Sequence, residues 1–319
     1  MSRLADLSAR REAMMRRFAF ETVDVFTDRR FGGNQLAVFP DARGLSDGEM
    51  QSLAAEFNLS ETTFVLPPED PAHSARVRIF NRTYEMPFAG HPNVGTGCVL
   101  ARHGLDRDGV LLFEELSGLV EVRVERDAAG AVTGAVIAAP QPLSTLMELP
   151  AEAIAACAGL APSDIITKAH QPVLASVGIP FVLVEVTGEA LTRATPDIAA
   201  FRRTQEQFPK VERRLSLHLY ARDPAAPDIA APGGARIRAR MFAPLSGTYE
   251  DPATGSANAT LGALLLSLSG AEAGQAEIVQ GVEMGRPSLL RVAARRAADG
   301  IRATVGGGCI PVLKGEAEV

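Results

Sequence analysis

Apolar positions along the chain divide it into many short strands and fewer helices. Strands are predicted where β-branched and aromatic residues run together or alternate with polar ones: residues 19–26, 62–66, 120–124, 175–186, 236–242, 277–280, 289–293 and 301–305. Helical spacing predicts helices at residues 46–58, 92–103, 151–158, 196–203 and 257–269. Because strands outnumber helices, the pattern indicates an α+β protein.

Glu61 stands out at a junction between two predicted elements. Ser46 and Glu49 form a capping-box pattern, and the helix that they begin ends just before Leu59. The strand that follows stops at Pro67. A carboxyl group at the edge of such an apolar strand can be partly desolvated, which raises its pKa toward the range useful for proton transfer. The local sequence alone leaves this role for Glu61 open.

The chain also contains an internal repeat. Residues 83–93 (TYEMPFAGHPN) match residues 248–258 (TYEDPATGSAN) at an offset of 165 residues. The similarity begins upstream, in the patterns 76–80 and 238–242, and continues to a glycine four residues beyond each Asn. Two copies separated by half the chain predict a duplicated domain rather than a solenoid, which needs at least three shorter repeats.

Each copy places a glycine before a helical run, where free backbone N–H groups and the positive end of a helix dipole are expected. Two such helix ends facing each other across a cleft would bind a carboxylate. The plainer alternative is that Gly90, Gly255 and the nearby prolines only form turns. The polar residues of both copies argue for the cleft.

Three polar side chains in the repeats are candidates for chemistry. His91 lies at the first helix start, where the dipole favours a neutral imidazole, although it could be a core histidine. Asp251 should approach the first copy across the cleft, but it could instead cap a helix or form a turn. Ser256 takes the position of His91 in the second copy and could bind an anionic substrate or serve as a cap.

Composition excludes several other functions. With 32 basic against 38 acidic residues and no Trp, the chain offers little to bind nucleic acid. The apolar run 259–268 is too short to cross a bilayer, and the N-terminal arginines are followed by no apolar signal segment. We therefore expect a cytoplasmic protein without nucleic-acid or membrane partners. Cys98, Cys157 and Cys309 are too widely spaced for a zinc site or disulfide framework and are expected to be buried free thiols.

Together these segments resemble the PhzF-like phenazine-biosynthesis family, which shares the diaminopimelate epimerase fold. The resemblance covers nearly the whole chain from residue 20 onward. It is carried by the segments 23–27, 33–34, 59–65, 88–92, 250–257, 280–281 and 285–288. It implies two pseudo-symmetric domains, each a mixed β-barrel-like sheet around a central helix, with the site between them.

The resemblance also implies the roles of particular residues. The proton-shuttling glutamate of the family falls on Glu61, which implies a catalytic site of Glu61, His91 and Asp251. Substrate-binding positions fall on four residues: Asn34, Gly90, Gly255 and Ser256. The implied reaction isomerises a small carboxylated substrate such as trans-2,3-dihydro-3-hydroxyanthranilate, without a metal or organic cofactor, in a homodimer. The sequence itself shows no interface pattern.

Two rival functions remain. Epimerases and racemases of this fold use two cysteines, but Ala89 and Thr254 occupy the matching positions here. A non-catalytic protein that binds small carboxylates would have no use for Glu61 near its ligand. For the domains, we expect an N-terminal extension (1–17), a first domain (18–139) and a second domain (140–319), with the last strand, 301–305 or 310–313, free to join either half.

Overall fold

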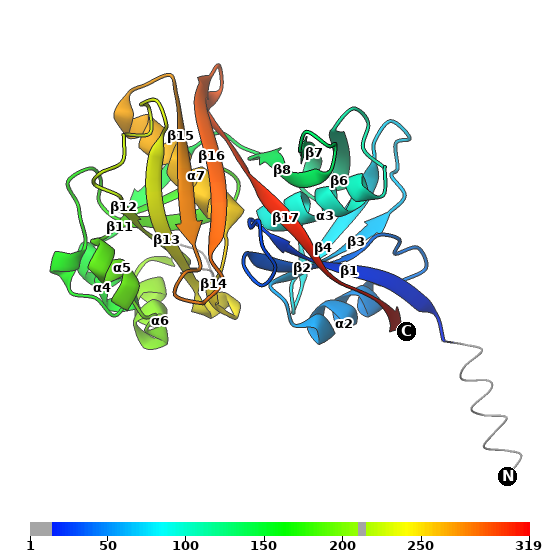
Figure 1. The fold of residues 1–319 in the computed structure, drawn as a ribbon. Helices are drawn as coiled ribbons and strands as arrows, with labels where there is room; N and C mark the ends of the chain where they lie inside the picture. Colours follow the sequence, from blue (N-terminus) through cyan, green and yellow to red (C-terminus); the bar gives the residue numbers. More distant parts are fainter. Residues whose placement is uncertain (1–14, 210–214) are drawn as a thin grey trace, which may run out of the picture.

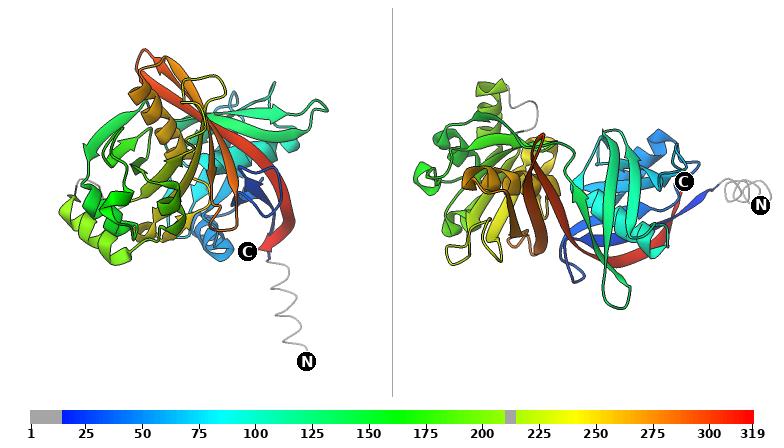
Figure 2. Two further views of the ribbon diagram at one scale, coloured as in Figure 1. Left: turned by 60° about the vertical axis from the view of Figure 1, so that its left-hand side comes forward. Right: turned by 90° about the horizontal axis from the view of Figure 1, so that it is seen from above.

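Two β-barrels lie side by side, each surrounding one long helix (Figures 1 and 2). The computed structural model describes residues 15–209 and 215–319. The first barrel is a closed ring of eight strands: β1 (Arg17–Val25), β2 (Asn34–Phe39), β3 (Glu61–Leu66), β4 (Ala75–Phe80), β6 (Val110–Glu115), β7 (Gly118–Arg126), β8 (Val132–Ala138) and the second part of β17 (Gly300–Glu318). The short β5 (Glu85–Met86) pairs with β4.

The second barrel uses the remaining strands. Their order is β9 (Ser144–Glu148), β10 (Val173–Ser176), β11 (Pro180–Glu185), β12 (Leu217–Arg222), β13 (Ala235–Ala243), β15 (Ala273–Gln280), β16 (Ser288–Ala297) and the first part of β17. The short β14 (Thr248–Asp251) pairs with β13. Backbone N–H groups of Ala139 and Leu143 donate to carbonyls of β17 and so bring the two ends of this sheet together.

The pairing pattern is the same in both halves. Strand β2 is parallel to β3 and β4 is parallel to β6, just as β11 is parallel to β12 and β13 to β15. The neighbouring pairs β3–β4 and β12–β13 are antiparallel. The predicted α+β fold of two pseudo-symmetric barrel-like domains is therefore confirmed.

Strand β17 belongs to both barrels. Residues 300–308 pair with β16 and β8, and residues 309–318 pair with β1. The two short strands expected near the C-terminus are therefore one strand of 19 residues. The chain first passes between the barrels across Pro140 and Pro142, between β8 and β9. The domain limits stay predictions, and residues 1–14 of the expected extension lie outside the described part of the chain.

A central helix fills each barrel. Helix α3 (Gly90–Arg102) lies in the first barrel, and helix α7 (Gly255–Ser269) lies in the second. Both begin two residues earlier than the sequence predicts, so the repeated glycines are the first residues of the helices. Nearly all residues of α3 are buried. The thiols of the three cysteines are buried and free, as predicted.

The outer helices cover the barrels. Helix α2 (Asp47–Phe57) has the predicted capping box between Ser46 and Glu49, and ends at Asn58 in the left-handed conformation. It covers a cluster of aromatic side chains in the first half, which includes Phe39, Phe64 and Phe80. Helices α4 (Ala151–Cys157), α5 (Gly188–Arg193) and α6 (Ile198–Gln207) cover the outer side of the second barrel. The described residues also form two 3₁₀ turns: η1 (Pro162–Asp164) and η3 (Pro244–Ser246).

Each central helix approaches a strand through a glycine of the repeat. A Cβ atom at Gly262 would lie 2.4 Å from Cγ1 of Val292, and one at Gly97 would lie 2.6 Å from Cγ1 of Val122. We expect Gly262→Ala to lower the free energy of unfolding by about 1–3 kcal/mol, because overpacking exceeds the ~1 kcal/mol gained in helix propensity. Chemical denaturation measures this cost.

Gly48 provides the matched control, since it lies in α2 with no atom within 4 Å of its added Cβ. Gly48→Ala should leave stability unchanged or raise it by up to about 1 kcal/mol. An unchanged or more stable Gly262→Ala protein would contradict the close packing between α7 and β16.

Candidate active site

The first turns of α3 and α7 meet where the two barrels touch. A Cβ atom at Gly90 would lie 3.3 Å from the backbone N of Ser256 and 3.4 Å from Cα of Gly255. The residues that precede the two helices, Ala89 and Thr254, make no side-chain cap bond to the helix N–H groups. These N–H groups therefore remain available, and two helix dipoles favour an anion at the same place.

Asp251 connects the two halves. Its Oδ1 accepts hydrogen bonds from Asn34 Nδ2 at 2.9 Å and from Ser60 Oγ at 3.3 Å, both in the first half. Its Oδ2 accepts from Thr254 Oγ1 at 2.6 Å. Asp251 caps no helix, so the expected alternative of a simple cap does not hold. A network of this kind fixes the carboxylate in one orientation.

Glu61 opens strand β3 beside this network. Its Oε2 lies 3.4 Å from Nδ1 of His91, and 16% of its side chain is exposed. Burial, and secondly the negative charge of Asp251, raise the pKa of Glu61 to about 8, whereas Arg82 opposes this rise. Burial also raises the pKa of Asp251 to about 6, against the hydrogen bonds from Thr254, Asn34 and Ser60.

The two carboxyl groups are thus driven to different protonation states at neutral pH. Asp251 is mainly ionised, and Glu61 carries a proton in most molecules. Pairs of titratable groups whose surroundings separate their pKa values in this way are typical of acid/base sites. Glu61 therefore has the properties of a residue that both takes and returns a proton.

His91 is buried and neutral. Burial lowers the pKa of its imidazole to about 3, and a hydrogen bond to the backbone of Gln35 opposes this. The cause is thus burial more than the helix dipole that the sequence suggested. Nε2 of His91 is buried and has no hydrogen-bond partner among the described residues. Buried polar atoms without a partner are rare, and each needs an explanation such as a functional role.

Ser256 lies on the other side of the helix ends. It lines a narrow crevice with a cavity volume of about 10 Å³, whose other walls are mainly apolar: Phe88, Gly90, Ile137, Ala139, Pro140, Val177, Gly178, Ile179, Ala259 and Val305. The helix ends therefore lie between the polar acid/base pair and a mainly apolar crevice that includes Gly90 and Ser256. Ligand sites commonly combine a few polar groups with apolar surroundings.

The structure brings all seven predicted site residues to this junction: Glu61, His91, Asp251, Asn34, Gly90, Gly255 and Ser256. Sequence reasoning did not assign Ser60, Thr254 or Gln280 to the site. Ser60 could have been assigned from its place beside Glu61. Thr254 could have been assigned from its place in the repeat, and Gln280 from its place in segment 280–281 of the resemblance. Within residues 15–209 and 215–319, no three His, Cys, Asp or Glu side chains are grouped as metal ligands.

The fold and the chain's relatives define the class of protein, a two-domain α+β isomerase. The chain belongs to the PhzC-PhzF family of phenazine biosynthesis-like proteins, whose family model matches residues 23–315. It is 40% identical over 276 residues to an uncharacterized isomerase of Mesorhizobium japonicum, which covers 84% of this chain and 88% of that protein. No helix of the described residues is long and apolar enough to cross a membrane.

A second relative has a named activity. The trans-2,3-dihydro-3-hydroxyanthranilate isomerase of Pseudomonas chlororaphis is 37% identical over 281 residues, covering 87% of this chain and 90% of that protein. Among solved structures, a phenazine biosynthesis protein of the PhzF family from Bacillus anthracis has a TM-score of 0.83. It is 23% identical and covers 95% of this chain and 100% of that one, so it shows the fold.

Proposed function

We propose that the chain is a cofactor-independent isomerase that moves a proton between two carbons of a small carboxylated substrate. Glu61 is the acid/base in this proposal, and trans-2,3-dihydro-3-hydroxyanthranilate is the candidate substrate, as for the relative from Pseudomonas chlororaphis. The observation that carries the proposal is the pairing of Glu61 and Asp251, with separated pKa values, beside two uncapped helix N-termini.

The substrate carboxylate binds at the N–H groups of α3 and α7, with the hydroxyl of Ser256 as a further donor. These donors stabilise the negative charge of the carboxylate and the charge that develops beside it when a nearby C–H bond breaks, so that bond becomes more acidic. Ionised Glu61 takes the proton, and the electron pair of the broken C–H bond moves into the adjacent double-bond system. The protonated Glu61 then forms a C–H bond at another carbon, so no oxidant or reductant is needed.

The neighbours of Glu61 support this shuttle. His91 Nε2 has no hydrogen-bond partner among the described residues, and in this proposal it binds a polar substrate atom. Burial, and secondly ionised Asp251, keep the pKa of Glu61 high, which favours the protonated form of Glu61 after the proton has been abstracted. The conjugate acid of Glu61, with a pKa of about 8, is suited to deliver a proton near neutral pH.

A two-base racemase is the second candidate, and the site disfavours it. Ala89 provides no base, and the hydroxyl of Thr254 is engaged with Asp251. The buried thiols of Cys98, Cys157 and Cys309 lie outside the site. Turnover of amino acids that is abolished by cysteine alkylation would revive this function.

The proposed function is tested by incubating the purified protein with trans-2,3-dihydro-3-hydroxyanthranilate in deuterated buffer. Mass spectrometry and NMR follow substrate loss and deuterium at carbon. We expect substrate consumption, with deuterium at the new C–H position to the extent that Glu61 exchanges its proton with solvent. A protein that neither consumes the compound nor exchanges its protons would remove this substrate, and the same assay on other carboxylated compounds would test the reaction class.

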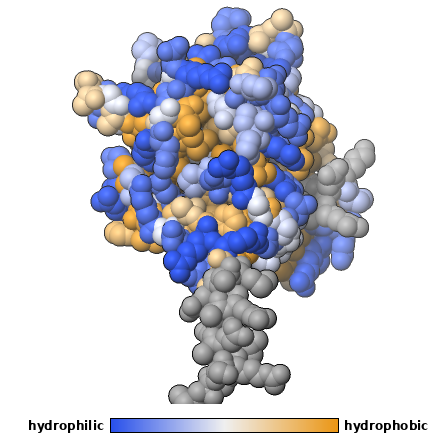
Figure 3. All heavy atoms as spheres, turned by 90° about the vertical axis from the view of Figure 1, so that its right-hand side faces the viewer, coloured by the Kyte–Doolittle hydropathy of each residue, from blue (hydrophilic) through white to orange (hydrophobic). Residues whose placement is uncertain are grey.

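We also propose that the protein acts as a homodimer in the cytoplasm, on the strength of the family resemblance. Figure 3 shows an apolar area among charged residues on the outer side of the first half, a surface typical of protein contacts. Leu116 and Leu119, in the hairpin of β6 and β7, are 65% and 54% exposed. Sedimentation as a monomer at micromolar concentration would contradict the dimer.

A further inference from the structure

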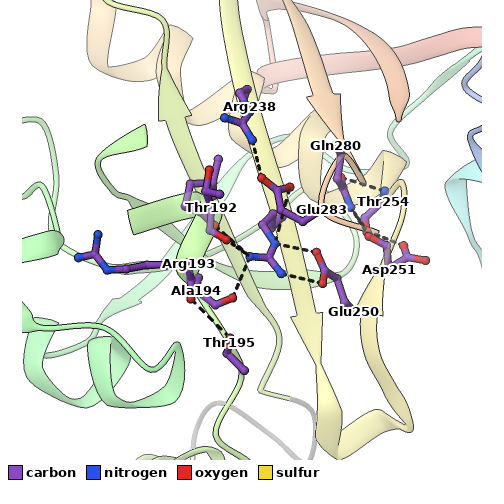
Figure 4. Close-up of polar contacts among 12 residues, drawn as sticks. Thr192, Arg193, Ala194, Thr195, Arg238, Glu250, Asp251, Thr254, Gln280 and Glu283 are labelled. Carbon is purple, nitrogen blue, oxygen red and sulfur yellow. Dashed lines mark hydrogen bonds and ion pairs between the residues drawn. The ribbon is translucent and has the colours of Figure 1, made fainter. Parts of the chain in front are cut away.

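The side chain of Gln280, the last residue of β15, is fully buried against the turn that carries Asp251. Its Nε2 donates to the backbone carbonyl of Asp251 at 2.8 Å and to Oγ1 of Thr254 at 3.1 Å. Its Oε1 accepts from the backbone N of Thr254 at 3.2 Å and from Nδ2 of Asn258 at 2.7 Å. Figure 4 shows Gln280, Thr254 and Asp251 as one connected group.

These bonds set the direction of the hydrogen bond to Asp251. A threonine hydroxyl has one hydrogen to donate. Because Gln280 donates to Thr254 Oγ1, the hydroxyl hydrogen is free to point at Oδ2 of Asp251, which lies 2.6 Å away. Such a short bond to a carboxylate is charge-assisted and strong. The amide of Gln280 therefore acts on Asp251 through Thr254.

The first half contains the same position with a different residue. At the offset of 165, Glu115 corresponds to Gln280, and it is likewise the last residue of its strand. Both carboxyl oxygens of Glu115 are buried, and the amide of Asn93 is the donor beside them. Met86 and Ala89 stand where the second half has Asp251 and Thr254. Both halves therefore have a buried polar side chain at this position. In the second half it donates to Thr254, which donates to Asp251, but Ala89 and Met86 cannot form these bonds in the first half.

We propose that Gln280 is a positioning residue of the active site, which holds the carboxylate of Asp251 in its orientation and hydrogen-bonded state through Thr254. Its counterpart Glu115 has no such role. The inference rests on the proposed function, since Asp251 serves the reaction described above. It assigns Gln280 a task that a residue present only for packing would not have.

Reciprocal exchange of the two residues tests the proposal. In Gln280→Glu, the introduced carboxylate cannot donate when ionised, so the Thr254 hydroxyl turns toward it and away from Asp251. When protonated, it resembles the amide in shape and retains one donor. A hydrogen bond to a charged group typically contributes a factor of roughly 10–100 to an equilibrium constant. We expect the ratio of kcat/KM between variant and wild type to rise at least about tenfold from pH 9 to pH 6.

Glu115→Gln is the matched control, and its kcat/KM should stay within about twofold of wild type at every pH. It should also gain stability at alkaline pH. Burial raises the pKa of Glu115 to about 8, with the Asn93 amide opposing. The stability that this raised pKa contributes is complete below the ordinary pKa of ~4.3 and is lost as the pH rises through 8. The substitution removes that loss. A pH-independent ratio for Gln280→Glu, or equal effects of both exchanges, would overturn the proposal.

A second measurement keeps this inference separate from the reaction. NMR of ¹³C-labelled aspartate reports the pKa of Asp251 without any substrate. We expect this pKa to rise in Thr254→Val, because it removes the donor to Oδ2. It should shift little in Gln280→Glu, whose introduced carboxyl is still protonated in the range where Asp251 titrates, and little in Glu115→Gln. If these pKa changes occur but the wild type shows no turnover, only the proposed reaction is rejected, and the role of Gln280 stands. An unshifted pKa in folded Thr254→Val would reject the role of Gln280 and Thr254.

Discussion

Replacement of Glu61 by Gln is expected to lower kcat by about 10²–10⁴-fold, the contribution typical of a general acid/base. The amide keeps the shape of the side chain and cannot accept or release the proton. Substrate binding should change little, because the carboxylate is held by the ends of α3 and α7. Steady-state kinetics together with calorimetric binding of the substrate measure both quantities.

The pH dependence of the wild type adds an independent check. If Glu61 acts first as a base, kcat/KM should rise with pH while Glu61 loses its proton and level off above its pKa of about 8. The Gln variant should lack this rise. A Gln variant with wild-type kcat would show that Glu61 is not the base and would favour a protein that only binds carboxylates.

The same substitution should stabilise the protein at alkaline pH. The folded-state pKa of Glu61 is raised, so its contribution to stability is complete below the ordinary pKa of ~4.3 and is lost as the pH rises through 8. Glu61→Gln removes this loss. Its unfolding midpoint at pH 9 should therefore exceed that of the wild type, whereas the two should differ less at pH 5.

Replacement of Arg240 by Met is expected to lower the free energy of unfolding by about 3–5 kcal/mol, because it leaves a buried charge without its partner. The guanidinium binds both oxygens of Glu250 at 2.8 Å, and its remaining nitrogen donates to the backbone carbonyls of Leu191 at 3.0 Å and Ala194 at 2.8 Å. Figure 4 shows Glu250 directly beside Asp251 on β14. Loss of this anchor should also reduce activity.

Arg78 is the counterpart of Arg240 in the first barrel and provides the control. It binds both oxygens of Glu85 at 2.7 and 2.6 Å, but 22% of the Glu85 side chain is exposed, against 10% for Glu250. The residue after Glu85 is Met86, whereas the residue after Glu250 is the site residue Asp251. Arg78→Met should therefore cost less than about half as much stability and leave kcat within about twofold. Urea unfolding and kinetics compare the pair. Equal losses in both variants would contradict a special role for the second anchor.

Local signals in the sequence predicted many of the elements. The capping box at Ser46 and the left-handed Asn58 limit α2 because they satisfy the backbone groups of the helix ends within a few residues. The β-branched run after Glu61 forms β3 for an equally local reason. The repeat of 165 residues predicted two related halves, and the pairing pattern agrees with it. The resemblance then placed the acid/base position on Glu61.

The long strand β17 was missed because its glycines look like a break. A Cβ atom at Gly307 would lie 2.6 Å from Cδ1 of Phe26, and one at Gly308 would lie 2.5 Å from the backbone oxygen of Thr27. These glycines allow β17 to pass close to the first barrel, and they do not end the strand. Only partners distant in sequence reveal this requirement.

The properties of the site likewise depend on contacts between distant residues. The sequence by itself determined the residue types, the capping box of α2 and the repeat, because these follow from local spacing. The tertiary structure decided that Asn34 and Ser60 bind Asp251 across the two halves. It also decided the high pKa of Glu61, because that value arises from burial and from a charge 190 residues away in the chain.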